Sequence, residues 1–204
     1  VEPIELEMVR RLPLAEQGDP AAQTILGQMY FLGEGTPRDS AKAASWFQMA
    51  AKQGYAKAEL ILGRLYGRGE GVPLDYREAI HWYQLAAEQG DATAQFNLGY
   101  IYEQGDMGAS QDYAEAARWY RLAADQGLME AELNLGTILA NGRGVERDYT
   151  GAVRLFHGAA EQGNVLAQFY LGAMYAKGLG VPLDYSEAAR WSGLAADQGN
   201  SEAE

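Results

Sequence analysis

The fold is decided by residues 91–127, which read DATAQFNLGYIYEQGDMGASQDYAEAARWYRLAADQG. The Leu-Gly pair and the Gln-Gly pair of this stretch recur along the chain at steps of 36 or 37 residues. The Leu-Gly glycines are Gly27, Gly63, Gly99, Gly136 and Gly172, and the Gln-Gly glycines are Gly18, Gly54, Gly90, Gly127, Gly163 and Gly199. Two markers that share one period of this length indicate an array of structural repeats, in which each unit packs only on its neighbours.

Each unit is predicted to form two helices joined by a glycine-containing loop. In the quoted unit, apolar residues recur at three- and four-residue spacing in both halves, which is the spacing of one helical face. Asp91 and Asp112 can cap the two helix starts, and Gly127 can end the second helix in a left-handed conformation. This pattern divides the chain into the units 19–54, 55–90, 91–127, 128–163 and 164–199.

Two further features of the predicted helix pair concern its caps and its one longer loop. An Asp precedes each second helix, and Glu78, Glu115 and Glu187 follow it by three residues, which predicts a reciprocal capping box in three units. The third loop, residues 104–109, contains the extra residue that lengthens one period to 37. We expect such an insertion in an exposed turn.

The Leu-Gly glycine lies inside the first helix, where glycine costs about 1 kcal/mol relative to alanine. Its presence in every unit predicts a close approach of the paired second helix that leaves no room for a side chain. All four tryptophans fall at one position of the repeat, where the fourth unit carries Leu155; they are Trp46, Trp82, Trp119 and Trp191. We expect them to fill space between helices rather than to hold a ligand.

The two ends of the chain depart from the repeat. Residues 1–18 keep only the second-helix ending Ala15-Glu16-Gln17-Gly18, with Pro13 before it, and are expected to form a degenerate capping helix. Residues 200–204 repeat the opening of a first helix and are expected to begin a truncated further repeat. An apolar face left there would allow end-to-end self-association, because terminal units of a solenoid need a polar cap.

Composition excludes several functions. A net charge of -12 and a pI near 4.6 oppose binding to nucleic acid and to anionic lipid surfaces. No apolar run approaches the roughly 18 residues of a membrane span, so direct membrane insertion is not expected. The absence of cysteine excludes disulfides and thiolate metal sites.

No motif predicts catalysis or a cofactor. His81 and His157 lie at different positions of their units, so they do not form a repeated metal set. The Gly67-x-Gly69-x-Gly71 spacing follows a predicted helix and lacks the Gly-Lys-Ser/Thr ending of a phosphate loop. We therefore predict no catalytic, cofactor-binding or metal residues, and a protein that is not an enzyme.

The unit of residues 92–127 resembles the SEL-one-like repeat family, a branch of the tetratricopeptide-like helical repeats. The matching residues are Ala92 and Ala94, Leu98-Gly99, Tyr102, Asp112, Ala116, Trp119-Tyr120, Ala123-Ala124 and Gln126-Gly127. The resemblance covers residues 19–199 and implies an all-α, right-handed α–α superhelical solenoid of five antiparallel helix pairs. It also implies a scaffold or adaptor for protein–protein contacts. Because bacterial members of the family often work in the periplasm or outside the cell, the resemblance favours a periplasmic or secreted location.

In such a solenoid the first helices line the concave side, so positions there that vary between units predict the surface that binds a protein or peptide. These positions lie three before and one, four and five after the Leu-Gly glycine. The candidate partner-binding residues are Gln28, Phe31, Leu60, Arg64, Arg68, Phe96, Tyr100, Glu103, Gln104, Thr137, Asn141, Phe169 and Lys177. The same positions also include Thr24, Leu32, Gly67, Leu133, Ala140, Ala173 and Ala176.

Two interpretations of this surface remain open. Arg64 and Arg68, beside Phe96 and Tyr100 of the next unit, could hold an acidic or C-terminal peptide, because arginine pairs with carboxylates in a bidentate manner. Alternatively, Phe96 fills space between units and the arginines are merely solvated. At the level of function, the interaction scaffold has one alternative: an architectural spacer within a larger, multidomain bacterial envelope protein.

Overall fold

The computed structural model of the chain describes residues 4–199, which contain eleven α-helices and no strand. They are α1 (Ile4–Glu16), α2 (Pro20–Leu32), α3 (Ser40–Ala51), α4 (Ala56–Arg68), α5 (Tyr76–Glu88), α6 (Ala92–Gln104), α7 (Tyr113–Ala124), α8 (Met129–Asn141), α9 (Tyr149–Glu161), α10 (Val165–Lys177) and α11 (Tyr185–Asp197). The all-α prediction is therefore confirmed. The further repeat expected at residues 200–204 lies outside the described residues.

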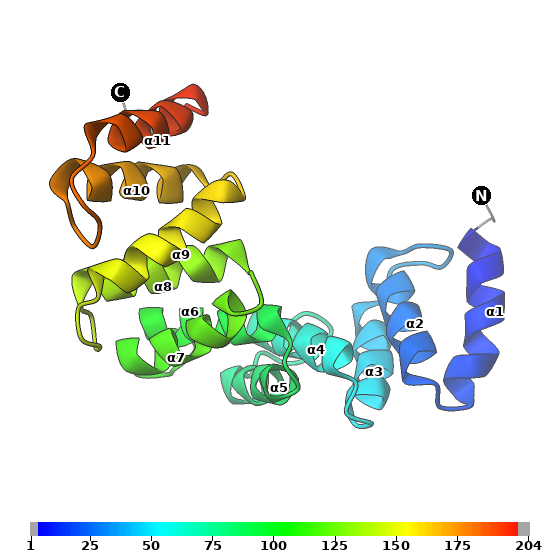
Figure 1. The fold of residues 1–204 in the computed structure, drawn as a ribbon. Coiled ribbons are helices and arrows are strands. Elements are labelled where there is room, and N and C mark those ends of the chain that lie inside the picture. Colours follow the sequence, from blue (N-terminus) through cyan, green and yellow to red (C-terminus); the bar gives the residue numbers. More distant parts are fainter. Residues whose placement is uncertain (1–3, 200–204) are drawn as a thin grey trace. The chain divides into compact units, whose positions relative to one another are not determined.

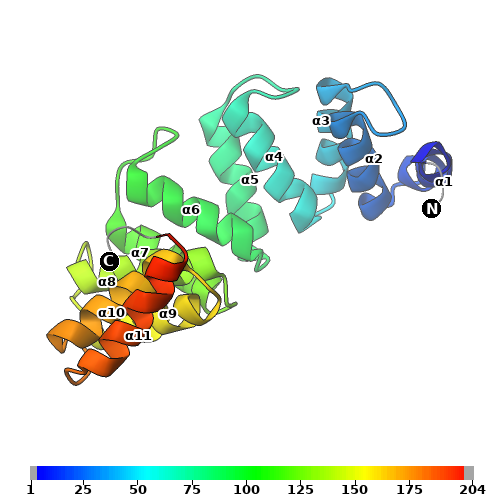
Figure 2. The same cartoon turned by 90° about the horizontal axis from the view of Figure 1, so that it is seen from above.

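The chain divides into two compact units. The first comprises Val1–Leu98 and Met107–Ala109, and the second comprises Gly99–Asp106 and Ser110–Glu204. Within each unit, helices that are consecutive in sequence pack side by side, α1 to α5 in the first and α7 to α11 in the second (Figures 1 and 2). Each unit is thus built from stacked helix pairs, as an α–α solenoid requires.

The helix boundaries follow from the caps that the sequence predicted. Asp39, Asp75, Asp112, Asp148 and Asp184 each accept a hydrogen bond from a backbone N–H of the first turn of a second helix. Past the end of these helices, the Gln-Gly glycines have positive φ, for example 92° at Gly90 and 80° at Gly127. Both signals were local, so they could be recognised without knowledge of the packing.

Only one of the two hydrogen bonds of the predicted capping box forms. The Asp side chain caps the helix, but the Glu side chain does not accept from the Asp N–H. The N–H of each capping Asp donates to a carbonyl near the end of the preceding first helix: Asp75 to Tyr66 at 3.1 Å and Asp112 to Tyr102 at 2.8 Å. The glutamates bond elsewhere: Glu78 Oε2 accepts from Trp82 Nε1, and Glu115 pairs with Arg118. The capping residue therefore joins the two helices of a pair, and no N–H is left for the Glu.

The Leu-Gly glycine meets the second helix as predicted. A Cβ built on Gly27 would lie 2.7 Å from the ring of Phe47, and one on Gly63 would lie 2.6 Å from the ring of Tyr83. Gly99 meets Tyr120 and Gly136 meets Phe156 in the same way. In the fifth repeat Ser192 replaces the ring, and the second helix still approaches, with Ala188 O 3.2 Å from the Cβ position of Gly172. In each pair the second helix thus packs directly on the backbone of the first helix.

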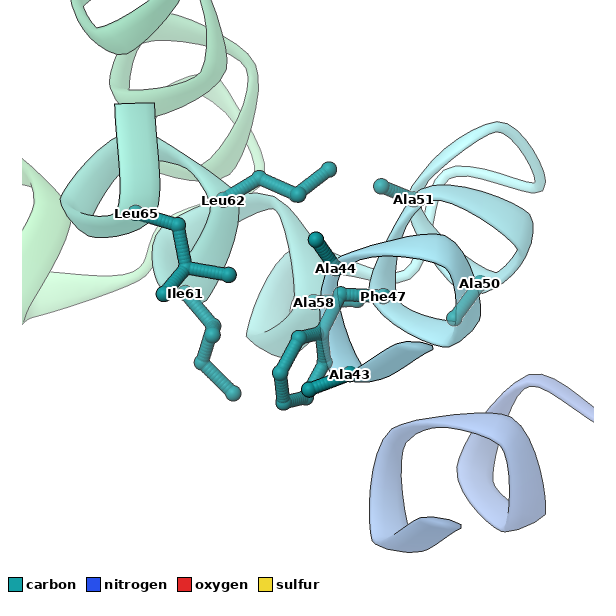
Figure 3. Packing of buried hydrophobic residues seen from close by; sticks show 9 residues of the cluster. All are labelled: Ala43, Ala44, Phe47, Ala50, Ala51, Ala58, Ile61, Leu62 and Leu65. Atoms are coloured by element: carbon teal, nitrogen blue, oxygen red, sulfur yellow. The ribbon is translucent and has the colours of Figure 1, made fainter. Parts of the chain in front are cut away.

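In the first three repeats the residue that follows the tryptophan is more deeply buried than the tryptophan itself. Trp119 and Trp191 are buried, but Trp46 and Trp82 are only half-buried. The next position carries Phe47, Tyr83, Tyr120 and Phe156, all 5% exposed or less. Figure 3 shows Phe47 in the core between α3 and α4, with Ala43 on its own helix and Ile61 on the next. The main aromatic wedge is therefore the ring that faces the glycine.

A polar bond between the two helices of a pair is repeated along the chain. The glutamine of the Gln-Gly motif donates to a side chain 30 residues earlier: Gln53 to Gln23, Gln89 to Glu59, Gln162 to Glu132 and Gln198 to Gln168, at 2.7–2.9 Å. Where the acceptor residue is glutamine, its own side-chain amide donates a second hydrogen bond, to a backbone carbonyl of the preceding helix. Gln23 donates to Ala15 O at 3.0 Å and Gln168 to Ala160 O at 3.2 Å. A glutamine at this position therefore links its repeat to the preceding helix.

In the second repeat the same position is occupied by Glu59, which is 2% exposed. An ionised carboxylate accepts hydrogen bonds and cannot donate one to a carbonyl as glutamine does. Burial raises the pKa of Glu59, although the hydrogen bond from Gln89 and the charge of His81 act in the opposite direction. The folded environment of Glu59 therefore favours its protonated form more than water does.

The glycine contact predicts the effect of one added methyl group. Gly63→Ala should lower the free energy of unfolding by about 1–3 kcal/mol, because the buried Tyr83 ring leaves no space for Cβ. Gly193→Ala is the matched control, since Gly193 lies inside α11 with nothing within 4 Å of its Cβ position. It should stabilise by up to about 1 kcal/mol. Urea unfolding followed by circular dichroism measures both, and equal effects would contradict the contact.

Glu59→Gln should raise the free energy of unfolding by about 1 kcal/mol at pH 7, because the amide can donate where the carboxylate cannot. A raised pKa in the folded state means that protonation stabilises the fold, so the penalty of Glu59 is absent below the unfolded pKa of about 4.3 and appears as pH rises. The gain should therefore vanish below about pH 4. Glu88→Gln, at an exposed position on α5, should show no such pH dependence. If Glu59→Gln gave a gain of equal size at pH 7 and below about pH 4, the assignment would be contradicted.

Candidate functional site

A first hollow lies between the first and second repeats, within the first compact unit. It has a volume of about 160 Å³ and is lined from α2, α3 and α4 by Gln28, Phe31, Leu32, Phe47, Ile61, Arg64 and Leu65. The floor is apolar, since Phe47 and Leu65 belong to the buried core. Gln28 and Arg64 supply the polar atoms, so the hollow combines an apolar interior with a polar rim.

A second hollow of about 390 Å³ lies between the fourth and fifth repeats, within the second compact unit. Its lining comes from α8, α9, α10 and the loop after α10, and consists of Thr137, Ala140, Asn141, Tyr149, Phe156, Tyr170, Ala173, Met174, Lys177 and Leu179. This volume falls within the range of about 300–1,000 Å³ that is usual for ligand pockets. The smaller first hollow suits a single side chain.

The two hollows occupy equivalent positions of the repeat. Counted from the Leu-Gly glycines, the seven residues that line the first hollow correspond one by one to Thr137, Ala140, Asn141, Phe156, Tyr170, Ala173 and Met174 of the second. The second hollow is larger because Ala140 stands in place of Phe31 and Ala173 in place of Arg64. One backbone arrangement thus produces a hollow whose size depends on a few side chains.

At the junction of the second and third repeats, the equivalent position is filled by a loop residue. Gly67 stands in place of Phe31, and the Met107 Cε lies 2.8 Å from its Cβ position. Met107 comes from the loop with the extra residue and has a φ of 50°, the one positive value for a non-glycine residue among the described residues. The insertion was expected simply to be an exposed turn, but the structure shows that it brings a half-buried side chain onto α4.

At the junction of the third and fourth repeats, a chain of hydrogen bonds occupies the equivalent positions. Asn134 Nδ2 donates to Tyr120 Oη at 3.1 Å, and Tyr120 Oη donates to Glu103 Oε2 at 2.7 Å. Burial, together with the bond to the Glu103 carboxylate, raises the pKa of Tyr120 well above its usual value. The hydroxyl therefore remains a donor at any physiological pH, and Glu103 is bound within the protein.

Each of the two hollows has a guanidinium group stacked on one of its rings. Arg38 lies over the ring of Phe31, 5.4 Å from its centroid, and Arg147 lies 5.7 Å from the centroid of Tyr149. These arginines are equivalent, since each comes five residues after the glycine that ends the first helix, Gly33 or Gly142. The other repeats carry Leu74, Gln111 and Leu183 there. Both arginines lie in loops, outside the first-helix positions that the variation between repeats predicted.

The structure places the predicted site residues in different surroundings. Gln28, Phe31 and Arg64 line the first hollow, and Thr137, Asn141 and Lys177 line the second. Leu60 and Arg64 also border a smaller hollow of about 70 Å³ next to Thr93 and Asn97. Thus Arg64 lies at the rim of two neighbouring depressions.

Other residues of the predicted surface are engaged or lie outside the hollows. Arg68 lies 3.9 Å from Glu70 in an exposed pair, and Thr24 is buried with its hydroxyl on Pro20 O, so Thr24 is not available to a partner. Phe96 and Phe169 are half-buried, and Gln104 is exposed. Tyr100 is 47% exposed but belongs to the second compact unit, whereas Arg64, Arg68 and Phe96 belong to the first. The patch of two arginines and two aromatic residues therefore stays a prediction.

The described residues contain no group of three or more His, Cys, Asp or Glu side chains placed to hold a metal ion. None of the described helices has the length and hydropathy needed to cross a bilayer. His157 lies 3.5 Å from Glu161 on the surface of α9 and 5.4 Å from the ring centroid of Trp191.

Stacked helix pairs with inter-repeat hollows define an α-helical repeat protein. A family model of the Sel1 repeat matches residues 20–55, 56–91, 92–128, 130–164 and 165–200. The chain therefore belongs to the Sel1 (SEL-one-like) repeat family, as the resemblance predicted. Proteins of this family are generally scaffolds for protein interactions and non-catalytic repeat proteins.

Two solved structures are similar over most of the chain. One is a protective antigen present in uropathogenic Escherichia coli strains that displays an SLR fold, with 39% identity, 93% of this chain covered and a TM-score of 0.87. The other is a Sel1 repeat protein from Oxalobacter formigenes, with 36% identity over 91% of this chain and a TM-score of 0.77. The match covers 40% of the E. coli protein and 76% of the O. formigenes protein. The comparison with curated proteins finds no match.

The hydrogen-bonded junction gives a direct test. Tyr120→Phe should lower the free energy of unfolding by about 1–2 kcal/mol, because it removes a bond to a carboxylate and leaves the Asn134 amide without its acceptor. Tyr83→Phe is the matched control: Tyr83 has the same place in its repeat and its hydroxyl forms no hydrogen bond to a described residue. Thermal unfolding should show no loss for the control, and equal losses would contradict the assignment.

Proposed function

We propose that this chain is a protein-interaction scaffold that binds peptide segments of a partner at the two hollows between its first helices. The observation that carries the proposal is the equivalence of the hollows. The same repeat positions form an open, partly apolar depression at the junction of the first and second repeats and again at the junction of the fourth and fifth. Gln28, Thr137 and Asn141, which were predicted from sequence variation, line these depressions.

The chemistry of the lining supports binding rather than catalysis. Apolar and aromatic side chains form the floors, and a few polar groups at the rim can orient a ligand, which is the usual composition of a binding pocket. The second hollow is large enough for an aromatic side chain with part of its backbone. Neither lining contains a His, Asp, Glu or Ser side chain that would serve as base or nucleophile.

The alternative is an architectural spacer within a larger protein. It is favoured by the coverage of the E. coli protein, of which this chain spans 40%. The description of that relative as a protective antigen supports an envelope or secreted location for this chain as well. A spacer would have no affinity for peptides at the hollows, so a binding experiment separates the two functions.

Filling the hollows should abolish peptide binding while the fold persists. A displayed library of random 12-residue peptides is selected against the full chain, and the enriched peptides are measured by fluorescence anisotropy. Gln28→Trp with Ala173→Trp places bulk in both hollows, and we expect at least about a tenfold loss of affinity, since a tenfold change corresponds to 1.4 kcal/mol. Glu88→Trp with Ala189→Trp, at exposed positions on second helices, is the matched control.

The outcomes distinguish the two functions. Binding that is lost in the filled variant and kept in the control supports the scaffold at the hollows. Binding that survives in the filled variant moves the site elsewhere on the chain, and a library that yields no binder at all supports the spacer. Circular dichroism of both variants verifies that the helices are retained.

A further inference from the structure

Two arginines lie beside the hollow of the first compact unit. Arg64 lies on the rim and is exposed, and Arg38 lies over the ring of Phe31 from the loop of the same repeat. Neither side chain forms an ion pair or a hydrogen bond with a described residue. Other exposed arginines of the chain pair with carboxylates, as Arg118 and Arg190 do. Both guanidinium groups at this depression are therefore available to a ligand.

The second compact unit repeats the arrangement with different residues. Lys177 lies on the rim of the second hollow and forms no ion pair with a described residue. Arg147 lies beside Tyr149 and donates weakly to its hydroxyl, with 3.4 Å between Nη1 and Oη. Neither hollow has an Asp or Glu in its lining. Two positive charges thus lie at each hollow, and no carboxylate is part of either lining.

At the other two junctions, charged residues at the equivalent positions are bound within the protein. Glu103 stands at the junction of the third and fourth repeats, at the position of Phe31 and Ala140, and its carboxylate is bound by Tyr120. Arg68, at the second junction, is paired with Glu70. Arginine after the first helix occurs in the first and fourth repeats, and these are the repeats whose junctions with the next repeat keep the two larger hollows.

We propose that both hollows recognise acidic peptide segments. An apolar side chain of the peptide enters the hollow, and Asp or Glu residues that flank it pair with Arg38 and Arg64 in the first hollow or with Arg147 and Lys177 in the second. This inference rests on the proposed peptide-binding function and adds the chemical class of the partner.

The net negative charge of the chain does not oppose this recognition at physiological salt. The Debye length is about 8 Å at 0.15 M ionic strength, so charges more distant than this are largely screened. A carboxylate at the rim interacts with a guanidinium at hydrogen-bond distance, where charge-assisted pairs are strongest. The local cations decide which peptides bind, and the distant carboxylates of the protein have little effect.

The test uses the composition of selected peptides and a charge series of the full chain. Peptides enriched from the random library at 0.15 M salt should carry a large apolar residue with Asp or Glu within two positions. Arg38→Ala with Arg64→Ala should weaken the peptides of the first hollow about tenfold, and Arg147→Ala with Lys177→Ala should weaken those of the second. Arg77→Ala with Arg154→Ala, at exposed positions on α5 and α9, should leave both unchanged.

Two further variants separate specific recognition from simple charge attraction. Replacing the apolar residue of an enriched peptide by Ser should abolish binding, whereas equal binding would reduce the interaction to nonspecific attraction and overturn the proposal. Arg64→Glu should reject the acidic peptides of the first hollow and accept versions in which the acidic residues are replaced by Lys.

Failure of this inference is distinguishable from failure of the proposed function. Enriched peptides that are neutral or basic, or that bind all charge variants equally, overturn the acidic partner and leave a peptide-binding scaffold. A selection that yields no peptide bound by the unmodified chain overturns the scaffold itself and the acidic partner with it.

Discussion

The contact between a glycine of the first helix and a ring of the second helix sets the distance between the two helices of each pair. Gly27, Gly63, Gly99 and Gly136 each face the side chain of a buried Phe or Tyr at a separation that no Cβ could share. The ring covers bare backbone, so the helices come closer than ordinary side chains would allow. In the fifth repeat a serine replaces the ring, and the Ser192 Oγ and the Ala188 carbonyl lie against Gly172 in its place.

Because every pair is closed in the same way, the surface between successive repeats also recurs. It can be left open or occupied by changing a few side chains. Met107 occupies it at one junction, a chain of hydrogen bonds through Tyr120 crosses it at another, and two junctions keep a hollow. Variation between otherwise identical units is the physical means by which a repetitive fold acquires distinct sites.

The buried polar position shows that repetition also brings a cost. Glutamine at this position joins three helices, as Gln23 does through Ala15 and Gln53. Glu59 keeps the bond from Gln89 but cannot donate onward while ionised, and its pKa is raised by burial. Burial disfavours the charged form of a carboxylate and has no such effect on a neutral amide. Nothing in the structure explains why two repeats carry the carboxylate.

The sequence by itself determined the helix pairs, their caps and the need for glycine at the close contact. All of these depend on interactions within one repeat, and the period reveals them. It also indicated first-helix positions, several of which line the hollows. Only the tertiary structure decided which junctions are open, because that depends on where side chains such as Met107 come to lie. It also corrected the capping box, since the Asp N–H bonds to the first helix, and it revealed Arg38 and Arg147, which reach the hollows from loops. Contacts between segments that are separate in sequence have no periodic signal, so they could be seen only once the chain was folded.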